Sequence, residues 1–272
     1  MPKSSRNCVW TLGMRLKCML AFPYELYKIL SGRSKPRQLG VRLGSDNLYF
    51  GFTSKICVDV IKTIMKNHGV GYSTVVHSAV NGGIARALKN SGIEPPAHID
   101  YGYVLPVPNH PGGLNIQATQ ANIHLPCRVQ CSKERLYQTQ HFLKNAEESN
   151  LPLAIYHGAS LLALAPIPIV RAMHKRMSNG GLSYMSNLPT TFTKEYADGL
   201  EIVDVFVTTS ISDDLGLFIS CGGINNKQRI MFNMDKSVFG DNATALKFAA
   251  CIEEELDVLE RLPKSITELN CY

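Results

Sequence analysis

Stretches with helical and strand-like patterns alternate along most of this 272-residue chain, and this alternation limits the fold more than any single motif does. Runs typical of strands occur at 47–53, 99–107, 115–125, 182–187, 201–209, 215–221 and 229–234. Runs with helical periodicity occur at 54–67, 73–88, 132–149 and 153–177, and from 241 onward. The pattern predicts an α/β protein with one large mixed sheet flanked by helices.

Capping residues mark several of these boundaries. Thr53 or Ser54 can cap the first helix, and Gly69 stands where that helix should stop. Asp241 is a good N-cap for the last helix. The glycine pair at 222–223 is expected to form the hairpin between the last two strands, not a nucleotide-binding loop.

The helix that begins at Ser73 contains two adjacent glycines, Gly82 and Gly83. Inside a helix each glycine costs about 1 kcal/mol relative to alanine. We therefore expect a neighbouring element to pack closely against this pair and offset the cost. In the last helix, the apolar stripe leaves Glu254 and Glu255 mainly outside it.

The positive charge is concentrated in the first 40 residues, which hold eight Lys and Arg residues and one Glu, whereas the whole chain carries a formal net charge of +6. Apolar residues such as Trp10 and Phe22 are interspersed with these cations, as in an interfacial amphipathic segment. We expect residues 1–40 to bind a membrane surface and expect no nucleic-acid partner; a linking helix docked on the body is the alternative. The corresponding location is the cytoplasmic face of a membrane, either the endoplasmic reticulum or the plasma membrane.

Two further patterns, one suggestive of a membrane span and one of a metal site, are interrupted. Residues 151–170 include His157 and three prolines, which favours a buried or lipid-facing surface helix over a span. His124, Cys127 and Cys131 match no standard zinc spacing and lack a fourth ligand, so we expect no metal.

Four stretches, taken together, have a recognisable order: "GYSTVVHSAV", "LPVPNHPGGLNIQATQANIHLP", "SYMSNLPTT" and "GLFISCGGINNKQRIMFNMDKSVFGD". They resemble the C-terminal half of the wax ester synthase/diacylglycerol acyltransferase family, which has the CoA-dependent acyltransferase fold of chloramphenicol acetyltransferase. The resemblance implies half of that fold. It implies an O-acyltransferase C-terminal domain at 47–262, after a basic amphipathic segment at 1–46 and before a tail at 263–272.

The resemblance also implies a reaction, in which a fatty acyl group passes from acyl-CoA to a lipid alcohol or diacylglycerol during neutral lipid synthesis. Acyl-CoA is then a co-substrate, and no cofactor is expected. In the family, the second histidine of an HHxxxD motif takes the proton of the attacking hydroxyl, which is a poor nucleophile until it loses that proton.

The HHxxxD motif is absent from this sequence. One interpretation is a partial chain whose base is supplied by a missing N-terminal half or by a full-length relative. The alternatives are a non-catalytic acyl-CoA- or lipid-binding protein and a partner-assembling half-domain. Val76-His77 and Thr190-Thr191 also depart from the family pattern, which puts catalysis by this chain in question.

Ser186 and Asn187 are the strongest candidates for the site, because the resemblance places them at a strand end that faces the reaction channel. Their hydroxyl and amide groups could donate hydrogen bonds to the oxyanion that forms on a thioester carbonyl; a turn that only fixes the loop is the alternative. Within the same family pattern, we assign a turn or structural role to Pro189, Asn115 and Asp241.

A basic stretch formed by Arg171, His174, Lys175 and Arg176 could bind a CoA phosphate, although cations also favour helix ends through the helix dipole alone. His77 lies off the apolar stripe of its helix, so we expect it to be solvated or locally hydrogen-bonded rather than a substitute base. His110 belongs to the turn "NHPGG" and is expected to have no other role.

Overall fold

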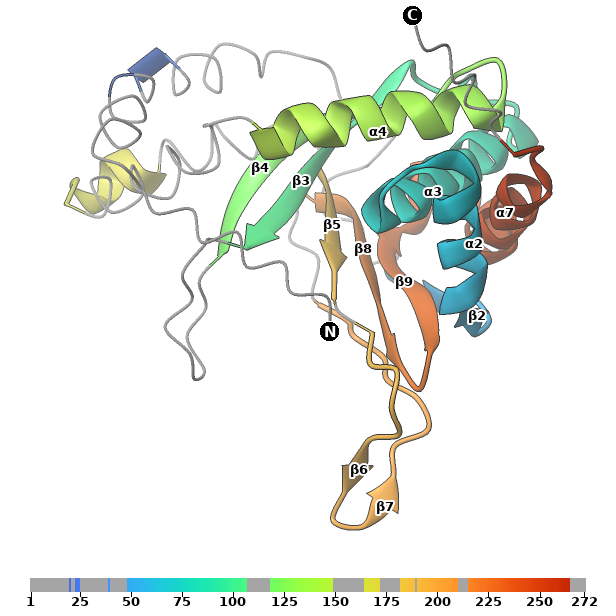
Figure 1. The fold of residues 1–272 in the computed structure, drawn as a ribbon. Coiled ribbons are helices and arrows are strands. Elements are labelled where there is room, and N and C mark those ends of the chain that lie inside the picture. The colour runs from blue at the N-terminus through green and yellow to red at the C-terminus, as the bar shows by residue number, and fades with distance from the viewer. Residues whose placement is uncertain are drawn as a thin grey trace, which may run out of the picture.

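The computed structural model describes residues 20, 23–24, 39, 48–106, 118–148, 164–171, 182–188, 190–209 and 215–264. Nearly all of the expected basic segment at 1–46 and most of the tail at 263–272 lie outside these residues. The described elements form a mixed sheet with helices packed against it (Figure 1).

Seven strands form the main sheet, and six of them follow the spatial order β1-β9-β8-β5-β3-β4, with β2 paired to β9. Their bounds are β1 Leu48–Phe52, β2 Ile56–Cys57, β3 His98–Pro106, β4 Ala118–Pro126, β5 Leu182–Asn187, β8 Leu215–Ile224 and β9 Lys227–Asp235. β5 runs parallel to both β3 and β8, and the other neighbours are antiparallel. The sheet is therefore mixed, as the sequence predicted.

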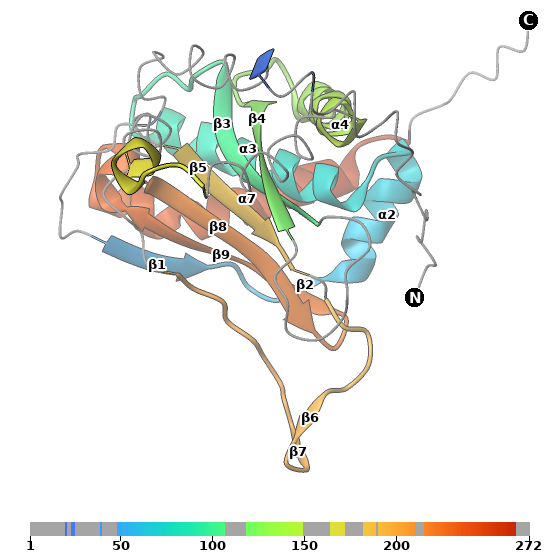
Figure 2. The same cartoon turned by 90° about the vertical axis from the view of Figure 1, so that its left-hand side faces the viewer.

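Helices α2 (Val58–His68), α3 (Tyr72–Asn90) and α7 (Asn242–Arg261) lie on one face of this sheet (Figures 1 and 2). Helix α4 (Ser132–Glu148) lies against β4 and α3. The inward faces of the strands supply the core between sheet and helices; for example, the rings of Phe232 and Phe248 meet with centroids 4.7 Å apart. Helix α3 packs against α2, α4 and α7.

The glycine pair of α3 lets α7 approach closely, as expected from the sequence. A Cβ atom on Gly83 would lie 3.0 Å from the backbone of Ile252, and one on Gly82 would lie 2.2 Å from Cγ of Glu255. Since real Cβ atoms do not approach other atoms this closely, both positions require glycine while α7 keeps its place. The contact offsets the helix-propensity cost of the two glycines.

Several predicted boundaries are confirmed. β5 covers 182–187 as predicted, and α4 covers 132–148. Gly69 ends α2 with a left-handed φ of 64°. Asp241 caps α7, because its Oδ1 accepts a hydrogen bond of 2.7 Å from the backbone N–H of Thr244.

Two element boundaries were wrong. The helix predicted from position 54 begins at Val58, because 56–57 instead form β2 and pair with β9. The glycines at 222–223 lie inside β8, and the hairpin turn is made by Asn225 and Asn226, whose φ angles are 57° and 58°. A pair of left-handed residues suits the twist of a two-residue hairpin.

The strand predicted at 201–209 was also wrong beyond its first residue. Only Leu200–Glu201 is extended in a ladder, as β7, which pairs with β6 (Tyr196–Ala197). Residues 202–209 instead cross the sheet face away from the helices, and side chains hold them there: Ser220 Oγ donates to the carbonyl of Val207 over 2.9 Å, and the Arg229 guanidinium pairs with Asp204. The β6–β7 hairpin projects from the body (Figure 1).

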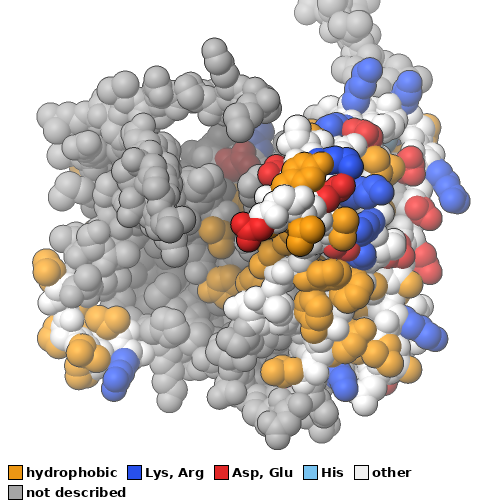
Figure 3. Space-filling model, turned by 90° about the horizontal axis from the view of Figure 1, so that it is seen from below, with side chains coloured by type: hydrophobic (Ala, Val, Ile, Leu, Met, Phe, Trp, Pro, Cys, Tyr) orange, Lys and Arg blue, Asp and Glu red, His pale blue; other side chains and the backbone are white. Residues whose placement is uncertain are grey.

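Apolar side chains also reach the surface of the described part. On the face seen in Figure 3 they lie among Lys, Arg, Asp and Glu side chains of both signs. Near the β6–β7 hairpin, Phe192, Tyr196, Leu200 and Val203 are all more than half exposed. Among the described helices, none combines the length and apolar character that a membrane crossing requires.

Candidate functional site

The carboxyl end of β5 meets the first turn of α3, and hydrogen bonds join them. Asn187 Nδ2 donates to Ser73 Oγ over 3.3 Å, and the hydroxyl of Tyr103 on β3 donates to the same oxygen over 3.3 Å. Ser73 therefore links the central strand β5 to β3 through one hydroxyl. We call this group, together with His77, Tyr72 and Thr190, the strand-end cluster.

Ser186 does not join the strand-end cluster. Successive side chains of a strand point to opposite faces, so Asn187 faces α3 while Ser186 faces the other side of the sheet, where its strand neighbour is Ser220. Among the described residues no hydrogen bond of the Ser186 hydroxyl is found. The structure therefore separates the two residues that the sequence analysis had placed together at an oxyanion.

His77 is fully buried one turn into α3, which corrects the expectation of a solvated side chain. Its alternative, local bonding, is confirmed: Nδ1 lies 2.7 Å from the carbonyl oxygen of Ser73 and donates its hydrogen there. The expectation of solvation failed because α3 is buried on nearly all sides, whereas the apolar stripe identifies only one. Since Nδ1 carries the hydrogen, Nε2 presents a lone pair.

Burial controls ionisation in this cluster. It lowers the pKa of His77 to about 4, so the ring is neutral at pH 7. Burial also raises the pKa of Tyr72 and Tyr103 and that of the Cys221 thiol, which lies opposite Asn187 on β8. Because all four groups are uncharged at neutral pH, the cluster can exchange hydrogen bonds with a ligand but offers no charge to it.

Two buried polar atoms of the cluster, His77 Nε2 and Asn187 Oδ1, have no hydrogen-bond partner within the described part of the chain, and the buried hydroxyls of Tyr72 and Thr190 lie next to each other. A buried polar atom left unpaired costs about 1–3 kcal/mol. The first two atoms can accept a hydrogen bond from a hydroxyl, and the two hydroxyls can donate to a carbonyl. A ligand that carries an alcohol or a carbonyl group would satisfy them.

The other predicted site residues are not brought to this cluster. Asp241 has the structural role expected of it: besides capping α7, its Oδ2 accepts a 2.8 Å hydrogen bond from Ser91, and these bonds hold its pKa below the usual range. Arg171 is exposed and belongs to the helical residues described at 167–171. The remaining predicted positions lie outside the described residues: His110, Asn115, His174, Lys175, Arg176 and Pro189.

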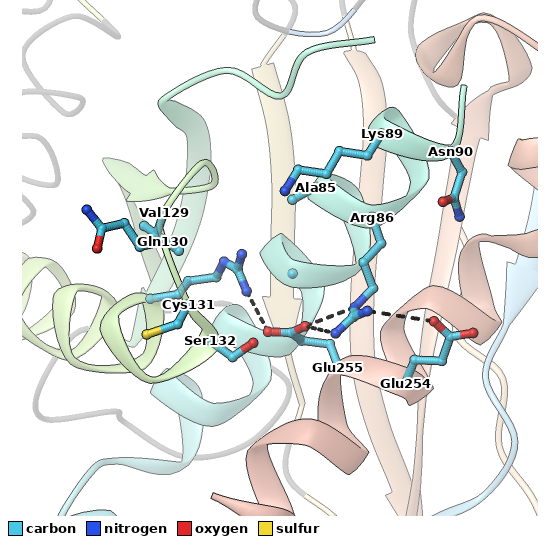
Figure 4. Close-up of a pocket in the computed structure, with 12 residues that line it drawn as sticks. Ala85, Arg86, Lys89, Asn90, Val129, Gln130, Cys131, Ser132, Glu254 and Glu255 are labelled. Atoms are coloured by element: carbon cyan, nitrogen blue, oxygen red, sulfur yellow. Dashed lines mark hydrogen bonds and ion pairs between the residues drawn. The ribbon is translucent and has the colours of Figure 1, made fainter. Parts of the chain in front are cut away.

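Sequence reasoning missed a second polar group, which lies where α3, α4 and α7 meet. The carboxylate of Glu255 is buried and accepts hydrogen bonds from Arg86 over 2.8 Å and from Arg135 over 2.5 Å (Figure 4). The expectation that Glu255 lies outside the apolar stripe was wrong. Its position three residues after buried Ile252 and next to buried Leu256 could have indicated an inward-facing carboxylate.

Among the described residues, no group of three or more His, Cys, Asp and Glu side chains could hold a metal ion. His124 pairs with Asp100 on the surface, while Cys127 is buried and Cys131 is exposed. Two groups of the described part thus bring buried polar side chains together: the strand-end cluster, through hydrogen bonds, and Glu255 with its arginines, through charge pairing.

Solved structures show which fold the chain has. The wax ester synthase/diacylglycerol acyltransferase from Marinobacter aquaeolei VT8 matches with a TM-score of 0.59 and 15% identity, over 92% of this chain and 58% of that one. The EpoB cyclization-docking bidomain from Sorangium cellulosum matches with a TM-score of 0.58 and 11% identity, over 93% and 52%. Trichothecene 15-O-acetyltransferase TRI3 from Fusarium sporotrichioides matches with a TM-score of 0.54 and 12% identity, over 93% and 53%. The chain has the chloramphenicol-acetyltransferase-like fold of acyltransferases and condensation domains.

Within that class, residues 117–260 match the model of the WS/DGAT C-terminal domain family, where WS/DGAT stands for wax ester synthase/diacylglycerol acyltransferase. This match covers just over half of the chain, which therefore belongs to that family. The resemblance and the fold class given by the sequence are confirmed. No curated protein matches the sequence. The chain spans a little over half the length of these three solved structures.

Proposed function

We propose that this chain is the C-terminal domain of an acyl-CoA:alcohol O-acyltransferase that serves neutral lipid synthesis. Its family membership supports an acyltransferase-type domain. The observation that carries the finer proposal is the strand-end cluster, whose unpaired atoms suit the two groups that ester formation brings together. The donor is then the thioester carbonyl of acyl-CoA, and the acceptor is the hydroxyl of a long-chain alcohol or diacylglycerol.

In this proposal the chain supplies one wall of the reaction channel and another segment or protein supplies the general base. Without the HHxxxD motif, the imidazole available in the cluster is His77, which is fully buried and already donates to Ser73. Asn187 orients the acyl-CoA carbonyl or the acceptor hydroxyl from the end of β5. The partner that brings the base is an N-terminal half or a full-length relative.

The test measures binding and turnover separately on residues 1–272. Binding of labelled palmitoyl-CoA is measured first, then acyl transfer to hexadecanol or diacylglycerol in micelles. We expect saturable binding that Asn187→Ala weakens about fivefold, the effect of losing one hydrogen bond of about 1 kcal/mol. Ser186→Ala is the matched control, because its side chain lies on the opposite sheet face, and we expect it to bind as the wild type does.

Three outcomes separate the alternatives. Binding without turnover, with turnover restored by a protein that carries HHxxxD, supports the proposal. Binding that never leads to turnover favours a non-catalytic acyl-CoA-binding protein, an alternative that the missing motif motivates. Turnover by the chain alone that His77→Gln abolishes would show that the base lies within this chain and contradict the proposal of an external base.

We also propose that residues 1–40 hold the domain on the cytoplasmic face of a membrane. Their cations and apolar residues support this location. Co-sedimentation with vesicles tests it: binding to vesicles that contain phosphatidylserine should exceed binding to phosphatidylcholine vesicles and should fall when Arg15 and Lys17 are changed to Gln. Equal binding to both vesicle types would contradict the role of the cations.

A further inference from the structure

A cavity of about 310 Å³ lies between the C-terminal half of α3, the beginning of α4 and α7 (Figure 4). Its walls include Arg86, Lys89, Ser132, Arg135 and Glu255. None of these residues belongs to the strand-end cluster, so the cavity is separate from the proposed reaction site. Its chemistry differs too, because it contains charged groups rather than neutral ones.

The charged groups that line this cavity do not balance. The guanidinium groups of Arg86 and Arg135 share the carboxylate of Glu255, and Arg86 also lies 3.9 Å from Glu254. With Lys89, three cations face these two carboxylates, which leaves one formal positive charge in excess. The side chain of Arg135 is only 8% exposed and that of Glu255 only 2%, whereas that of Arg86 is 35% exposed. Charges removed from water are costly unless opposite charge compensates them. An additional anion in the cavity would complete this compensation.

One of these cations, Lys89, lies at the rim. It follows Arg86 by one turn on α3 and points across the opening, and among the described residues its ammonium group has no ion pair or hydrogen bond. Glu254 opposes it in charge, but that side chain is 63% exposed and lies 3.9 Å from Arg86, so water screens it strongly. The cations of the cavity are therefore only partly compensated.

The cavity also has a built floor. The Glu255 carboxylate fills the space that a side chain at Gly82 would occupy, and it holds Arg86 and Arg135 from one side. Within the described part of the chain, Nε and Nη2 of Arg135 donate to the carbonyl of Cys127, each over 3.3 Å. Guanidinium groups fixed in this way are suited to tetrahedral oxyanions, to which they can donate more than one hydrogen bond.

We propose that this cavity binds a phosphate group, either as inorganic phosphate or on a small phosphorylated molecule. Arg135 and Arg86 form its inner contacts, Lys89 closes the outer side, and the Ser132 hydroxyl lies at the opening. Binding neutralises the excess charge around Glu255 and stabilises the junction of α3, α4 and α7. This inference stands without the proposed acyltransferase function, because it uses none of the strand-end residues.

The first experiment measures the thermal unfolding midpoint as inorganic phosphate replaces chloride at constant ionic strength. A ligand that binds only the folded state raises the midpoint in a saturable way. We expect Lys89→Gln to weaken the apparent affinity about fivefold, since it removes one charge-assisted contact. Ser132→Asp should weaken the apparent affinity at least tenfold, because it places a carboxylate at the opening that repels phosphate. The variant should still fold, because acidic residues are favourable in the first turn of a helix.

Lys66→Gln is the matched control, because Lys66 is exposed on α2, away from the cavity. It should leave the phosphate affinity unchanged. A parallel titration with adenosine 3′,5′-bisphosphate identifies the source of the group: tighter binding than inorganic phosphate indicates a phosphorylated nucleotide such as the CoA end, and equal or weaker binding indicates free phosphate. The proposal is overturned if phosphate gives no saturable shift, or if both cavity variants keep an affinity within twofold of the wild type.

A second measurement locates the site on the molecule. Cys131 is exposed at the cavity wall, whereas Cys57 is exposed elsewhere. The rate of iodoacetamide labelling at each cysteine is measured by peptide mass spectrometry. Phosphate should slow the labelling of Cys131 and leave the labelling of Cys57 unchanged. Equal rates at Cys131 with and without saturating phosphate would place the ion outside the cavity and contradict the proposal.

Discussion

At its N-terminal end, helix α3 places Ser73 and His77 among neutral hydroxyl and amide groups, whereas nearer its other end it places Arg86 against the carboxylate of Glu255. Among the described residues, the first region contains buried polar atoms without a hydrogen-bond partner, and its titratable groups are uncharged at pH 7. In the second region the two guanidinium groups share a buried carboxylate, and glycine allows α7 to approach. One helix thus combines an open hydrogen-bonding site with a closely packed anchor.

This difference indicates how the fold divides stability and function. Unpaired polar atoms reduce stability, so they persist only where the surrounding packing holds them in place. The contacts of Gly82 and Gly83 with α7 can supply that support for α3. The comparison leads to four experiments, each of which acts on one end of the helix.

The largest effect is expected from Glu255→Gln at the charged end. This change removes the carboxylate that two guanidinium groups share, and breaking a buried ion pair costs about 3–5 kcal/mol. Urea unfolding should therefore show a much lower free energy of unfolding. Glu254→Gln is the control, because that side chain is 63% exposed and should change stability little. Similar losses in both variants would show that burial of Glu255 is not what matters.

A pH series tests the neutral end. Burial lowers the pKa of His77 to about 4 in the folded protein, from 6.5 for the ordinary side chain. The unfolded chain therefore takes up the proton first as the pH falls, and stability that is present above pH 6.5 is lost as the pH falls toward 4. The shift corresponds to about 3 kcal/mol.

The measurement compares the wild type with His77→Gln by urea unfolding from pH 7 to 4. Tyr101 and Tyr103, whose rings face His77, have pKa values raised by burial and do not titrate in this range. Burial also lowers the pKa of His68, which contributes to the pH dependence of both proteins equally. The difference between their two stability curves therefore reports His77 alone. Parallel curves for the two proteins would contradict a buried neutral ring.

Gly82→Ala tests whether the anchor depends on close approach. The added Cβ would lie 2.2 Å from Cγ of Glu255, so the carboxylate must move away from its arginines. We expect a loss of about 2–3 kcal/mol, in the range of overpacked cores. At Gly71, which begins the same helix, a Cβ would make only ordinary contacts of 3.6 Å, and Gly71→Ala should therefore change stability little. Equal losses of stability in Gly82→Ala and Gly71→Ala would show that close approach at Gly82 does not matter.

The smallest effect is expected from Ser73→Ala. The change removes the hydroxyl that accepts hydrogen bonds from Asn187 and Tyr103, both 3.3 Å long, at a cost of about 1 kcal/mol. Its effect on palmitoyl-CoA binding should exceed its effect on thermal stability, because Asn187 loses its orientation. A variant with wild-type binding would show that Ser73 has only a structural role.

The fold could be predicted from local signals that the structure keeps. Asp241 caps α7 through a hydrogen bond to a residue of the same helix, and Gly69 ends α2 through its own left-handed backbone conformation. The strand at 182–187 begins and ends where its pattern predicts. The errors came from tertiary pairing. Residues 56–57 join β9 instead of starting a helix, and the glycines at 222–223 lie within a strand because Gly223 approaches the backbone of Lys227.

The site was harder to predict for a physical reason. Periodicity identifies one buried face of a helix, but α3 is buried nearly all round, so His77 was placed outside although it is inside. The same reasoning placed Glu255 in solvent. The family pattern led to Asn187, whereas Ser73 and Tyr103, its partners, come from distant parts of the sequence and carry no local pattern. Whether a buried polar atom lacks a hydrogen-bond partner depends on the folded structure and cannot be read from the sequence.

The pairing of β1 with β9 has a consequence for the order in which the protein can assemble. Residues 48–52 pair with residues 231–235, so β1 cannot form its hydrogen bonds until β9 is present. A ribosome makes the chain from the N-terminus, and pairing between distant segments is slow because the long intervening loop must close. Until β9 emerges, the apolar residues Leu48, Phe50 and Phe52 stand on an unpaired strand edge, which is prone to aggregate. Synthesis of this domain should therefore depend on chaperones until nearly its whole length has been made.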